Sequence, residues 1–180
     1  FERALKDRLA KFGLEVAADK TKTLRFGHNG GPHNGRFDFL GFEFYWEPDR
    51  QGQPRVKRRT ATKKWRAGIQ RMTEWVKTHR HQKLSRTFKT LKAKLQGTWN
   101  YYGLIGNYRR MQLFYGATCR TLHKWLNRRS QRPSLTWPAL NRMLARFQVP
   151  RPRIVEKYKL GMPCQKELSF CQRVLAFRRP

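Results

Sequence analysis

The stretch Arg36-Phe-Asp-Phe-Leu-Gly-Phe-Glu-Phe-Tyr45 has the composition of a β-strand with a glycine at its centre. Phenylalanines alternate with other residues on both sides of Leu40-Gly41, but in opposite phases. Alternation with a period of two predicts a strand with one buried face, and the change of phase predicts a bulge or bend at Leu40-Gly41. We therefore expect a strand over 36–45 that is re-aimed at its centre.

A helix and another strand are predicted before this stretch. From Phe1 to Phe12 apolar residues recur at helical spacing, and Gly13 occupies the usual position of a helix C-cap. The run Thr21–Phe26 is strand-like, and residues 28–35 after it are rich in Gly, Asn and Pro, as loops are. We expect the two strand-like runs to pair as a hairpin.

Three helices with bulky apolar stripes are predicted after it. The second has Ser85 as a plausible N-cap, and the third starts near Asn107. A shorter fourth helix is expected to begin at Thr136 or Trp137, because Pro138 is tolerated in a first helical turn. The three stripes consist of Trp65, Ile69, Met72 and Val76, of Phe88, Leu91, Leu95, Trp99 and Tyr102, and of Tyr108, Met111, Tyr115, Thr118, Leu122 and Trp125.

The charge is divided unevenly along the chain. The 180 residues include 41 Lys or Arg and 11 Asp or Glu, a formal net charge of +30. Residues 1–49 contain eight cationic and eight acidic residues, so the other 131 residues, with 33 cationic and three acidic ones, carry the whole excess. Such an excess repels itself in a compact chain unless a polyanion neutralises it, and nucleic acid is the commonest such partner. An anionic membrane surface is the second possibility.

The change of charge coincides with the turn-forming residues 47–54 and predicts two units. We expect a helix and hairpin over 1–49, a linker over 50–60, a helical unit over 61–147 and an irregular basic tail over 148–180. The predicted fold class is α+β, with the helical unit built as a three-helix bundle. Because the sequence opens with a helix already under way, we interpret it as a fragment of a longer protein.

The sequence lacks the motifs of a complete enzyme. It contains no GxSxG, HExxH or Walker-type loop. Its three cysteines form no CxxC pair, and its five histidines have no carboxylate or cysteine at ligand spacing, so no metal site is predicted. No run approaches about 18 apolar residues and no signal peptide is visible, so we expect no membrane partner and a reducing, cytoplasmic, bacterial location in association with nucleic acid.

Aromatic residues set among Lys and Arg favour nucleic-acid binding, because cationic side chains neutralise the backbone and aromatic rings stack on nucleobases. Most of these rings fall on the apolar stripes, where core packing is the expected role. Tyr101 and Trp75 lie off the stripes and are better candidates for exposure. For a short cationic run such as 57–59, a solvated surface without a partner is the alternative.

Two groups of motifs resemble the reverse transcriptases encoded by group II introns, also called maturases. Lys11-Phe-Gly-Leu-Glu-Val-Ala-Ala-Asp-Lys-Thr21 and then Phe37-Asp-Phe-Leu-Gly-Phe42 look like the last two conserved blocks of the palm. Gln96-Gly-Thr-Trp-Asn-Tyr-Tyr-Gly103, followed by Tyr115 and the stretch 122–129, is similar to the maturase-specific thumb. The fold that this resemblance implies is the end of a palm followed by a helical thumb.

The resemblance covers roughly residues 1–147 and implies roles for single residues. Lys20 falls on the palm lysine that approaches the incoming nucleotide's phosphates, as a catalytic residue that neutralises charge or protonates the leaving group. An exposed turn lysine is the alternative. Phe39, Leu40 and Gly41 match the primer grip, which supports the primer 3′ end, with ordinary core packing as the alternative. The helix that opens the chain would pack on the palm sheet.

The resemblance also implies partners. The basic side of the thumb would hold intron RNA, or an RNA template with its DNA product. The family binds Mg²⁺ through aspartates of earlier palm blocks, so we expect Mg²⁺ in the parent RNA-directed DNA polymerase and none bound by this fragment, which alone would catalyse nothing. The expected phosphate contacts are Lys57, Arg58, Arg59, Lys63, Lys64, Arg66, Arg109, Arg110, Arg128 and Arg129.

Two further functions fit the same residues. A reverse transcriptase that has lost its intron and serves another element, such as a phage-defence system, is a variant within the class. A non-enzymatic RNA-binding protein of ribosomal or chaperone type is the alternative from a different class, because it needs only the basic helices.

Overall fold

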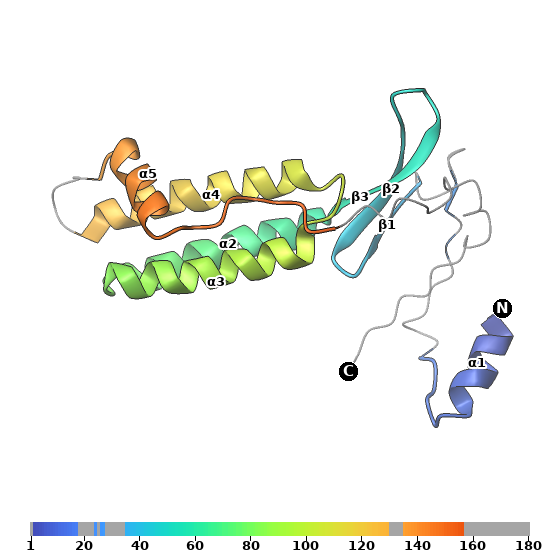
Figure 1. Ribbon diagram of the computed structural model, residues 1–180. Coiled ribbons are helices and arrows are strands. Elements are labelled where there is room, and N and C mark those ends of the chain that lie inside the picture. The colour runs from blue at the N-terminus through green and yellow to red at the C-terminus, as the bar shows by residue number, and fades with distance from the viewer. Residues whose placement is uncertain (1, 18–23, 25, 28–34, 130–134, 157–180) are drawn as a thin grey trace.

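A computed structural model of the chain describes residues 2–17, 24, 26–27, 35–129 and 135–156. Within these ranges the chain forms a three-stranded antiparallel sheet and five α-helices, which confirms the predicted α+β class. Figure 1 shows the sheet at one end of an elongated helical bundle. The elements are α1 (Glu2–Ala10), β1 (Arg36–Phe39), β2 (Phe42–Pro48), β3 (Pro54–Thr60), α2 (Thr62–His79), α3 (Leu84–Tyr102), α4 (Tyr108–Leu126), the 3-10 helix η2 (Asn127–Arg129) and α5 (Trp137–Arg146).

The stretch 36–45 forms a complete hairpin and not one bent strand. Phe39 lies opposite Phe42, which leaves Leu40 and Gly41 as a two-residue turn with φ of 49° and 81°. Positive φ at both central residues is typical of a type I′ turn, whose twist matches that of the flanking strands. The chain therefore changes direction where the phase change predicted it, but through a turn instead of a bulge.

The sheet has an aromatic face and a charged face. Residues paired across antiparallel strands point to the same side, so the pairs Phe37 with Phe44 and Phe39 with Phe42 place four rings on one face. The rings of Phe37 and Phe44 are stacked with centroids 5.1 Å apart. The other face carries the charged residues Arg36, Asp38, Glu43, Glu47, Arg55, Lys57 and Arg59.

The third strand lies where a linker was expected. β3 starts at Pro54 and pairs along its whole length with β2, so residues 50–60 are mostly strand and the linker prediction is wrong there. The expected strand 21–26 falls largely outside the described residues. Phe26, at its end, belongs to no strand, and its ring stacks on Trp46 at a centroid distance of 5.4 Å.

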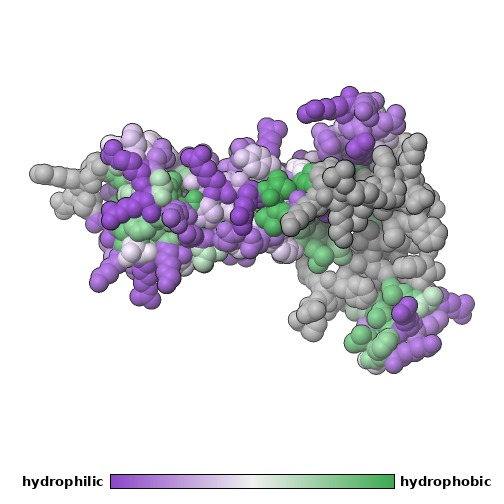
Figure 2. Space-filling model, in the orientation of Figure 1, coloured by the Kyte–Doolittle hydropathy of each residue, from purple (hydrophilic) through white to green (hydrophobic). Residues whose placement is uncertain are grey.

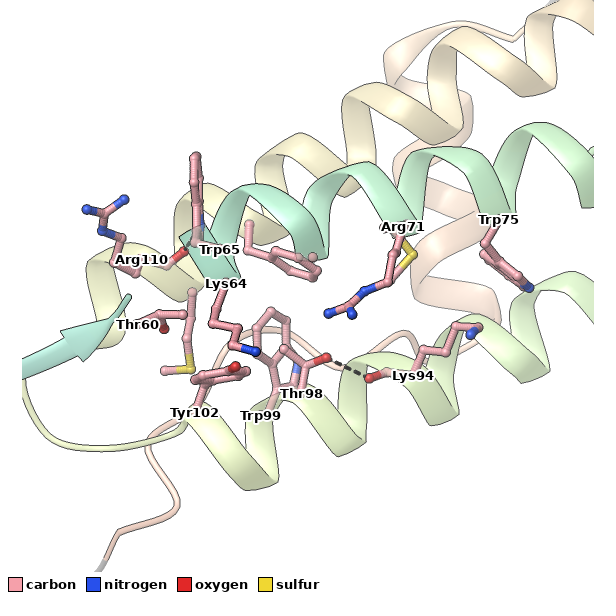
Figure 3. A pocket seen from close by; sticks show the side chains of 14 residues that line it. Thr60, Lys64, Trp65, Arg71, Trp75, Lys94, Thr98, Trp99, Tyr102 and Arg110 are labelled. Carbon is pink, nitrogen blue, oxygen red and sulfur yellow. Dashed lines mark hydrogen bonds between the residues drawn. The ribbon is translucent and has the colours of Figure 1, made fainter. Parts of the chain in front are cut away.

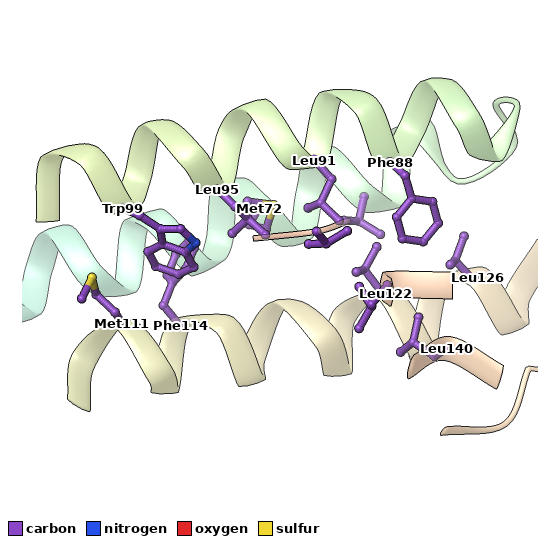
Figure 4. Packing of buried hydrophobic residues seen from close by; sticks show 13 residues of the cluster. Met72, Phe88, Leu91, Leu95, Trp99, Met111, Phe114, Leu122, Leu126 and Leu140 are labelled. Carbon is purple, nitrogen blue, oxygen red and sulfur yellow. The ribbon is translucent and has the colours of Figure 1, made fainter. Parts of the chain in front are cut away.

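The predicted apolar stripes, except for Tyr108, which is 44% exposed, meet in one core between α2, α3 and α4. Figure 4 shows Leu91, Leu95 and Trp99 of α3 directed towards the facing helices, and all three are fully buried. Asn107 precedes α4 as predicted, whereas Lys83, and not Ser85, precedes α3. The three-helix bundle is therefore the part of the fold that the helical spacing predicted best.

The fourth helix closes the end of the bundle far from the sheet (Figure 1). Thr136 caps it as predicted, because its side chain accepts a hydrogen bond from the amide of Ala139. Leu140 is fully buried in the core. Phe147, which follows the helix, stacks on Phe88 with ring centroids 4.6 Å apart.

Residues 149–156 return along the bundle to the sheet and form a strap (Figure 1). The indole of Trp99 donates a 3.0 Å hydrogen bond to the carbonyl of Pro150. The amides of Val155 and Glu156 both donate to the carbonyl of Gly103, at 2.7 and 3.1 Å. The first part of the predicted irregular tail is therefore packed on the helices, and residues 157–180 lie outside the described residues.

The first helix does not lie on the sheet. α1 ends at Ala10, and Gly13 follows it with a φ of 67°, the left-handed conformation that suits a residue after a helix end. Phe12 is 73% exposed. Figure 1 shows α1 apart from the sheet. Within the described residues, α1 therefore does not pack on a sheet in the way that the resemblance implies.

Gly97 lies inside α3 and Gly103 is its C-cap, and replacement of each by alanine is expected to change stability in opposite directions. A Cβ on Gly103 would collide with the carbonyl oxygen of Trp99 and lie 2.8 Å from that of Arg153, whereas a Cβ on Gly97 meets nothing within 4 Å. Gly103→Ala should therefore destabilise the fold by about 1–3 kcal/mol. Gly97→Ala should stabilise it by up to about 1 kcal/mol, because alanine favours a helix interior.

Urea unfolding of the two variants beside the parent chain measures both effects. A neutral Gly103→Ala would contradict the close approach of the strap to the end of α3.

Candidate nucleic-acid interface

The sheet is fastened to the bundle by Asn107, in the loop between α3 and α4. Its side chain is fully buried. The side-chain oxygen accepts the amide of Thr60 at 2.9 Å, and the side-chain nitrogen donates at 2.8 Å to the Thr60 hydroxyl and to the carbonyl of Tyr102. Because a buried amide is costly unless it is hydrogen-bonded, these contacts fix the end of β3 against the end of α3.

The hairpin turn packs against the end of α3. The carbonyl of Leu40 accepts a 2.7 Å hydrogen bond from the hydroxyl of Tyr101, and the carbonyl of Gly41 accepts the amide of Ala61 at 2.9 Å. The ring of Phe42 stacks on that of Tyr101 with centroids 5.6 Å apart. The expected primer-grip residues thus meet the motif that resembles the thumb.

The side chains proposed for exposure have mixed outcomes. Tyr101 is 52% exposed, as predicted, although its ring and hydroxyl contact the hairpin. Trp75 is only half-exposed, because the ring of His79 stacks on it at 5.3 Å and the ammonium of Lys94 lies 5.3 Å from its ring centroid. Leu40, at the apex of the turn, is 63% exposed, while Phe39 is half-buried.

The three expected phosphate contacts on β3 are paired with carboxylates. Lys57 lies 2.9 Å from Glu47, the guanidinium of Arg59 donates two hydrogen bonds to Glu43, at 2.7 and 3.1 Å, and Arg58 pairs with Glu156 of the strap. Their charge is partly neutralised within the chain, and their role as phosphate contacts stays a prediction.

Glu156 joins the strap, the sheet and the α3–α4 loop, and sequence reasoning missed it. One carboxylate oxygen accepts from Arg58 and the other accepts from the amide of Ile105 at 2.8 Å. Burial alone would raise the pKa of this carboxyl, but the amide of Ile105 and the guanidinium of Arg58 hold the pKa below its usual value. The available signal was rarity, because only three acidic residues follow residue 49.

The expected contacts near the starts of α2 and α4 are less compensated. Lys63, Lys64 and Arg66 are exposed on the first turns of α2, whose first turn contains no acidic residue. Arg109 is exposed at the start of α4, which also has no acidic residue in its first turn. Helix N-termini carry partial positive charge, so this end of the bundle attracts anions.

Arg110 differs from these residues because it links α4 to α2. It donates a 3.3 Å hydrogen bond to the Thr62 hydroxyl, and its guanidinium lies 5.4 Å from the ring centroid of Trp65. The indole of Trp65 in turn donates to the carbonyl of Arg110 at 3.3 Å. Arg110 therefore has a structural role that its sequence position did not indicate.

At the opposite end of the bundle, four cations surround one indole ring. The charged groups of Arg128, Arg80, Lys124 and Lys77 lie 5.1, 5.4, 5.7 and 5.9 Å from the ring centroid of Trp125. This Trp125 cluster draws two cations from α2 or its end and two from α4 and η2. Of the four, only Arg128 was predicted; it lies three residues after Trp125, at helical spacing, whereas Lys77 and Arg80 come from α2 or its end. Cations held this close together favour a bound anion.

Arg129, the last of the expected contacts, is not in this cluster. Its guanidinium donates a 3.1 Å hydrogen bond to the carbonyl of Gln82, in the connection between α2 and α3. The residue is half-buried. Its position ties η2 to that connection.

A groove of about 270 Å³ runs between α2 and α3. Figure 3 shows Lys64 and Arg71 of α2 and Lys94 of α3 around it, with aromatic rings at its base and ends. Sequence reasoning named only Lys64 among these cations, because the groove depends on how the two helices are spaced. Figure 2 shows hydrophilic residues over most of the visible face of the bundle, with small apolar areas between them.

The remaining expectations concern a lysine outside the described residues, metal ligands and membrane-spanning helices. Lys20, the expected catalytic lysine, falls outside the described residues. Within the described ranges no group of three or more His, Cys, Asp or Glu residues could hold a metal ion. In the same ranges no helix has both the length and the apolar character needed to cross a bilayer.

Comparisons with protein-family models, with curated proteins and with solved structures found no match to this chain. The function therefore has to be argued from the residues and their geometry.

The paired carboxylates predict how stability depends on pH. Hydrogen bonding to Arg59 is the main cause that lowers the pKa of Glu43, and the pKa of Glu156 is lowered as well. Groups with a lowered folded-state pKa contribute stability that is present above their unfolded pKa and is lost as pH falls through the folded pKa. Glu156→Gln should therefore lower the free energy of unfolding at neutral pH. The difference in this free energy between the variant and the unsubstituted chain should shrink as the pH falls.

Urea unfolding at pH 7 and at steps towards acid checks this expectation. Glu74→Gln, at an exposed carboxylate of α2, is the matched control and should change little at any pH. A difference for Glu156→Gln that is the same at all pH values would contradict the charged pairing.

Proposed function

We propose that this chain is the palm end and thumb of a reverse transcriptase of the group II intron type, and that its helical unit binds RNA and template–primer duplex. The observation that carries the proposal is the contact between the hairpin turn and the end of α3. Two motifs that resemble separate blocks of that family lie against each other, with the carbonyl of Leu40 bonded to Tyr101.

In this function the hairpin would serve as a rigid support for the primer end. Its turn is bonded to α3 through Tyr101 and to the start of α2 through Ala61. A backbone held at two points loses little further entropy when a strand binds to it, which favours precise positioning. The exposed side chain of Leu40 would face the nucleic acid.

The helices would supply the electrostatic contacts. α2 has 18 residues and is therefore about 27 Å long at 1.5 Å per residue. Lys63, Lys64 and Arg66 lie at its start, and Lys77 and Arg80 lie at its other end. Cations spread over that length can neutralise phosphates along most of one turn of a duplex.

The chemistry of polymerisation would belong to a longer chain. Mg²⁺ would supply charge stabilisation of the transferred phosphoryl group there, held by aspartates that this sequence does not include. Within the present sequence, Lys20 would neutralise the incoming phosphates or protonate the leaving group.

A basic RNA-binding protein without enzymatic activity is the second candidate. The Trp125 cluster favours it, because this group of cations lies far from the hairpin and needs no polymerase active site. A Tyr-x-Asp-Asp block encoded upstream of residue 1 would favour the polymerase, and its absence there would favour the second candidate.

RNA affinity of the chain should fall steeply as salt rises, because each neutralised phosphate releases a counterion. Arg128→Gln should weaken RNA binding several-fold. It should also make the slope of log affinity against log salt shallower by about the amount that one phosphate contact contributes. Arg55→Gln removes the same formal charge from a residue that lies 2.7 Å from Asp49, so it should reduce affinity less.

Fluorescence anisotropy of a labelled RNA over a salt series measures both quantities. If the RNA affinity of the unsubstituted chain did not change with salt, RNA binding through the cationic surface would be contradicted. Equal effects of Arg128→Gln and Arg55→Gln would contradict the special role of the Trp125 cluster.

Lys20→Ala, introduced into a chain that includes the upstream palm blocks, should slow nucleotide addition by about 10²- to 10⁴-fold, the range for loss of a general acid. RNA affinity should hardly change. Single-nucleotide extension kinetics and RNA titration measure the two separately, with Lys22→Ala as the control. Parallel losses of rate and affinity would remove the chemical role.

A further inference from the structure

We propose that the groove between α2 and α3 holds one unstacked nucleobase of a bound single-stranded RNA, with the adjoining phosphates on Lys64, Arg71 and Lys94. The inference rests on the proposed RNA binding and specifies where and how a strand is held.

The groove exists because side chains on its two walls are small. Gly68 of α2 has no side chain, and a Cβ at this position would lie 3.3 Å from the ring of Phe114. Thr98 of α3 lines the facing wall. The base of the groove consists of the side chains of Met72, Trp99 and Phe114, which belong to the core. Its floor is therefore apolar and rigid, and its volume of about 270 Å³ suits a single small ring system.

Four cationic residues, Lys64, Arg71, Lys94 and Arg110, line the groove, and no carboxylate is among the residues that line it. Figure 3 shows the ends of Lys64 and Arg71 directed into the space between the helices. Among the described residues neither makes an ion pair with a carboxylate, in contrast to Lys57 and Arg59 on the sheet. Like charges gathered at the edge of an apolar space repel one another, and a phosphate group relieves that repulsion.

Aromatic rings at the ends of the groove provide stacking surfaces. Trp75 lies at one end, where the ring of His79 stacks on it and the ammonium of Lys94 lies 5.3 Å from its ring centroid, and Trp65 and Tyr102 line the other end. Stacking on aromatic side chains beside a cationic backbone site is the usual mode by which proteins hold single strands. An acidic peptide would engage the cations but would not need an aromatic-lined apolar floor.

Two of the uncharged polar groups of the groove are already used within the protein. The hydroxyl of Thr98 donates to the carbonyl of Lys94 at 2.8 Å, and the indole nitrogen of Trp65 donates to that of Arg110 at 3.3 Å. These two groups are therefore not available to read the edges of a nucleobase, which favours recognition of its flat face and tolerance of different sequences.

The test fills the groove without changing charge. Thr98→Phe places a ring in it, while Thr90→Phe makes the same replacement at an exposed position of α3 that does not line the groove. The probes are a single-stranded RNA of about a dozen nucleotides and an inorganic polyphosphate of similar charge. Thr98→Phe should weaken RNA binding about tenfold and leave polyphosphate binding unchanged. Thr90→Phe should alter neither, and thermal melts verify that both variants are folded.

Each other result overturns a distinct claim. Equal loss of RNA and polyphosphate would show a phosphate site without a nucleobase, and unchanged RNA binding by Thr98→Phe would show that the groove is not occupied. Either result contradicts this inference and leaves RNA binding standing. A parent chain that binds no RNA contradicts the proposed function as well. If Thr98→Phe is unfolded, Lys94→Gln with Lys89→Gln as its control replaces it, and equal RNA affinities of these two would overturn the inference.

Discussion

The side chain of Asn107 makes the contact on which the arrangement of sheet and bundle depends. It bonds the end of β3 through Thr60 and the end of α3 through Tyr102, and it directly precedes α4. A buried amide that loses its partners costs about 1–3 kcal/mol, so these segments are strongly favoured in this arrangement. The hairpin turn meets the same point, because Gly41 bonds to Ala61 at the start of α2. The primer-grip-like turn, the groove and the helix starts are therefore positioned by one small polar junction.

The few acidic residues divide the cations of this chain into two classes. Glu43, Glu47 and Glu156 pair with cations of β3, so the sheet uses its charges largely to hold itself and the strap together. Most helical cations have no such partners among the described residues, and four cations, of which only Lys77 lies near a carboxylate, that of Glu74 at 3.9 Å, gather around Trp125. The net charge of +30 thus understates how sharply the positive potential is confined to the bundle. A polyanion that docks there does not have to break the ion pairs of the sheet.

Sequence patterns predicted the helices well because one physical rule, burial of a stripe at helical spacing, determines them locally. Trp99 and Leu122 are fully buried as their spacing predicts. β3 was missed because, in the sequence alone, Lys57 and Arg59 look like part of a solvated cationic run. Only the fold shows that acidic and aromatic residues of β2 lie opposite them. The hairpin was half predicted, since a two-residue turn and a bulge leave the same change of phase at Leu40-Gly41. The groove, the Trp125 cluster and Glu156 depend on distances between helices, which no local pattern contains.

The strap has a consequence for the order in which the chain can fold. Arg58 and Glu156 are 98 residues apart, and their pairing closes a loop that contains the whole helical bundle. Closing long loops costs entropy and slows the formation of the contacts that depend on them. During synthesis the helices can associate early, but the indole of Trp99 has no Pro150 carbonyl to bond, and Arg58 has no Glu156 to pair with, until the last of these residues has emerged. Among the described residues, the contacts of the strap with the sheet and with the end of α3 are therefore the last to be completed.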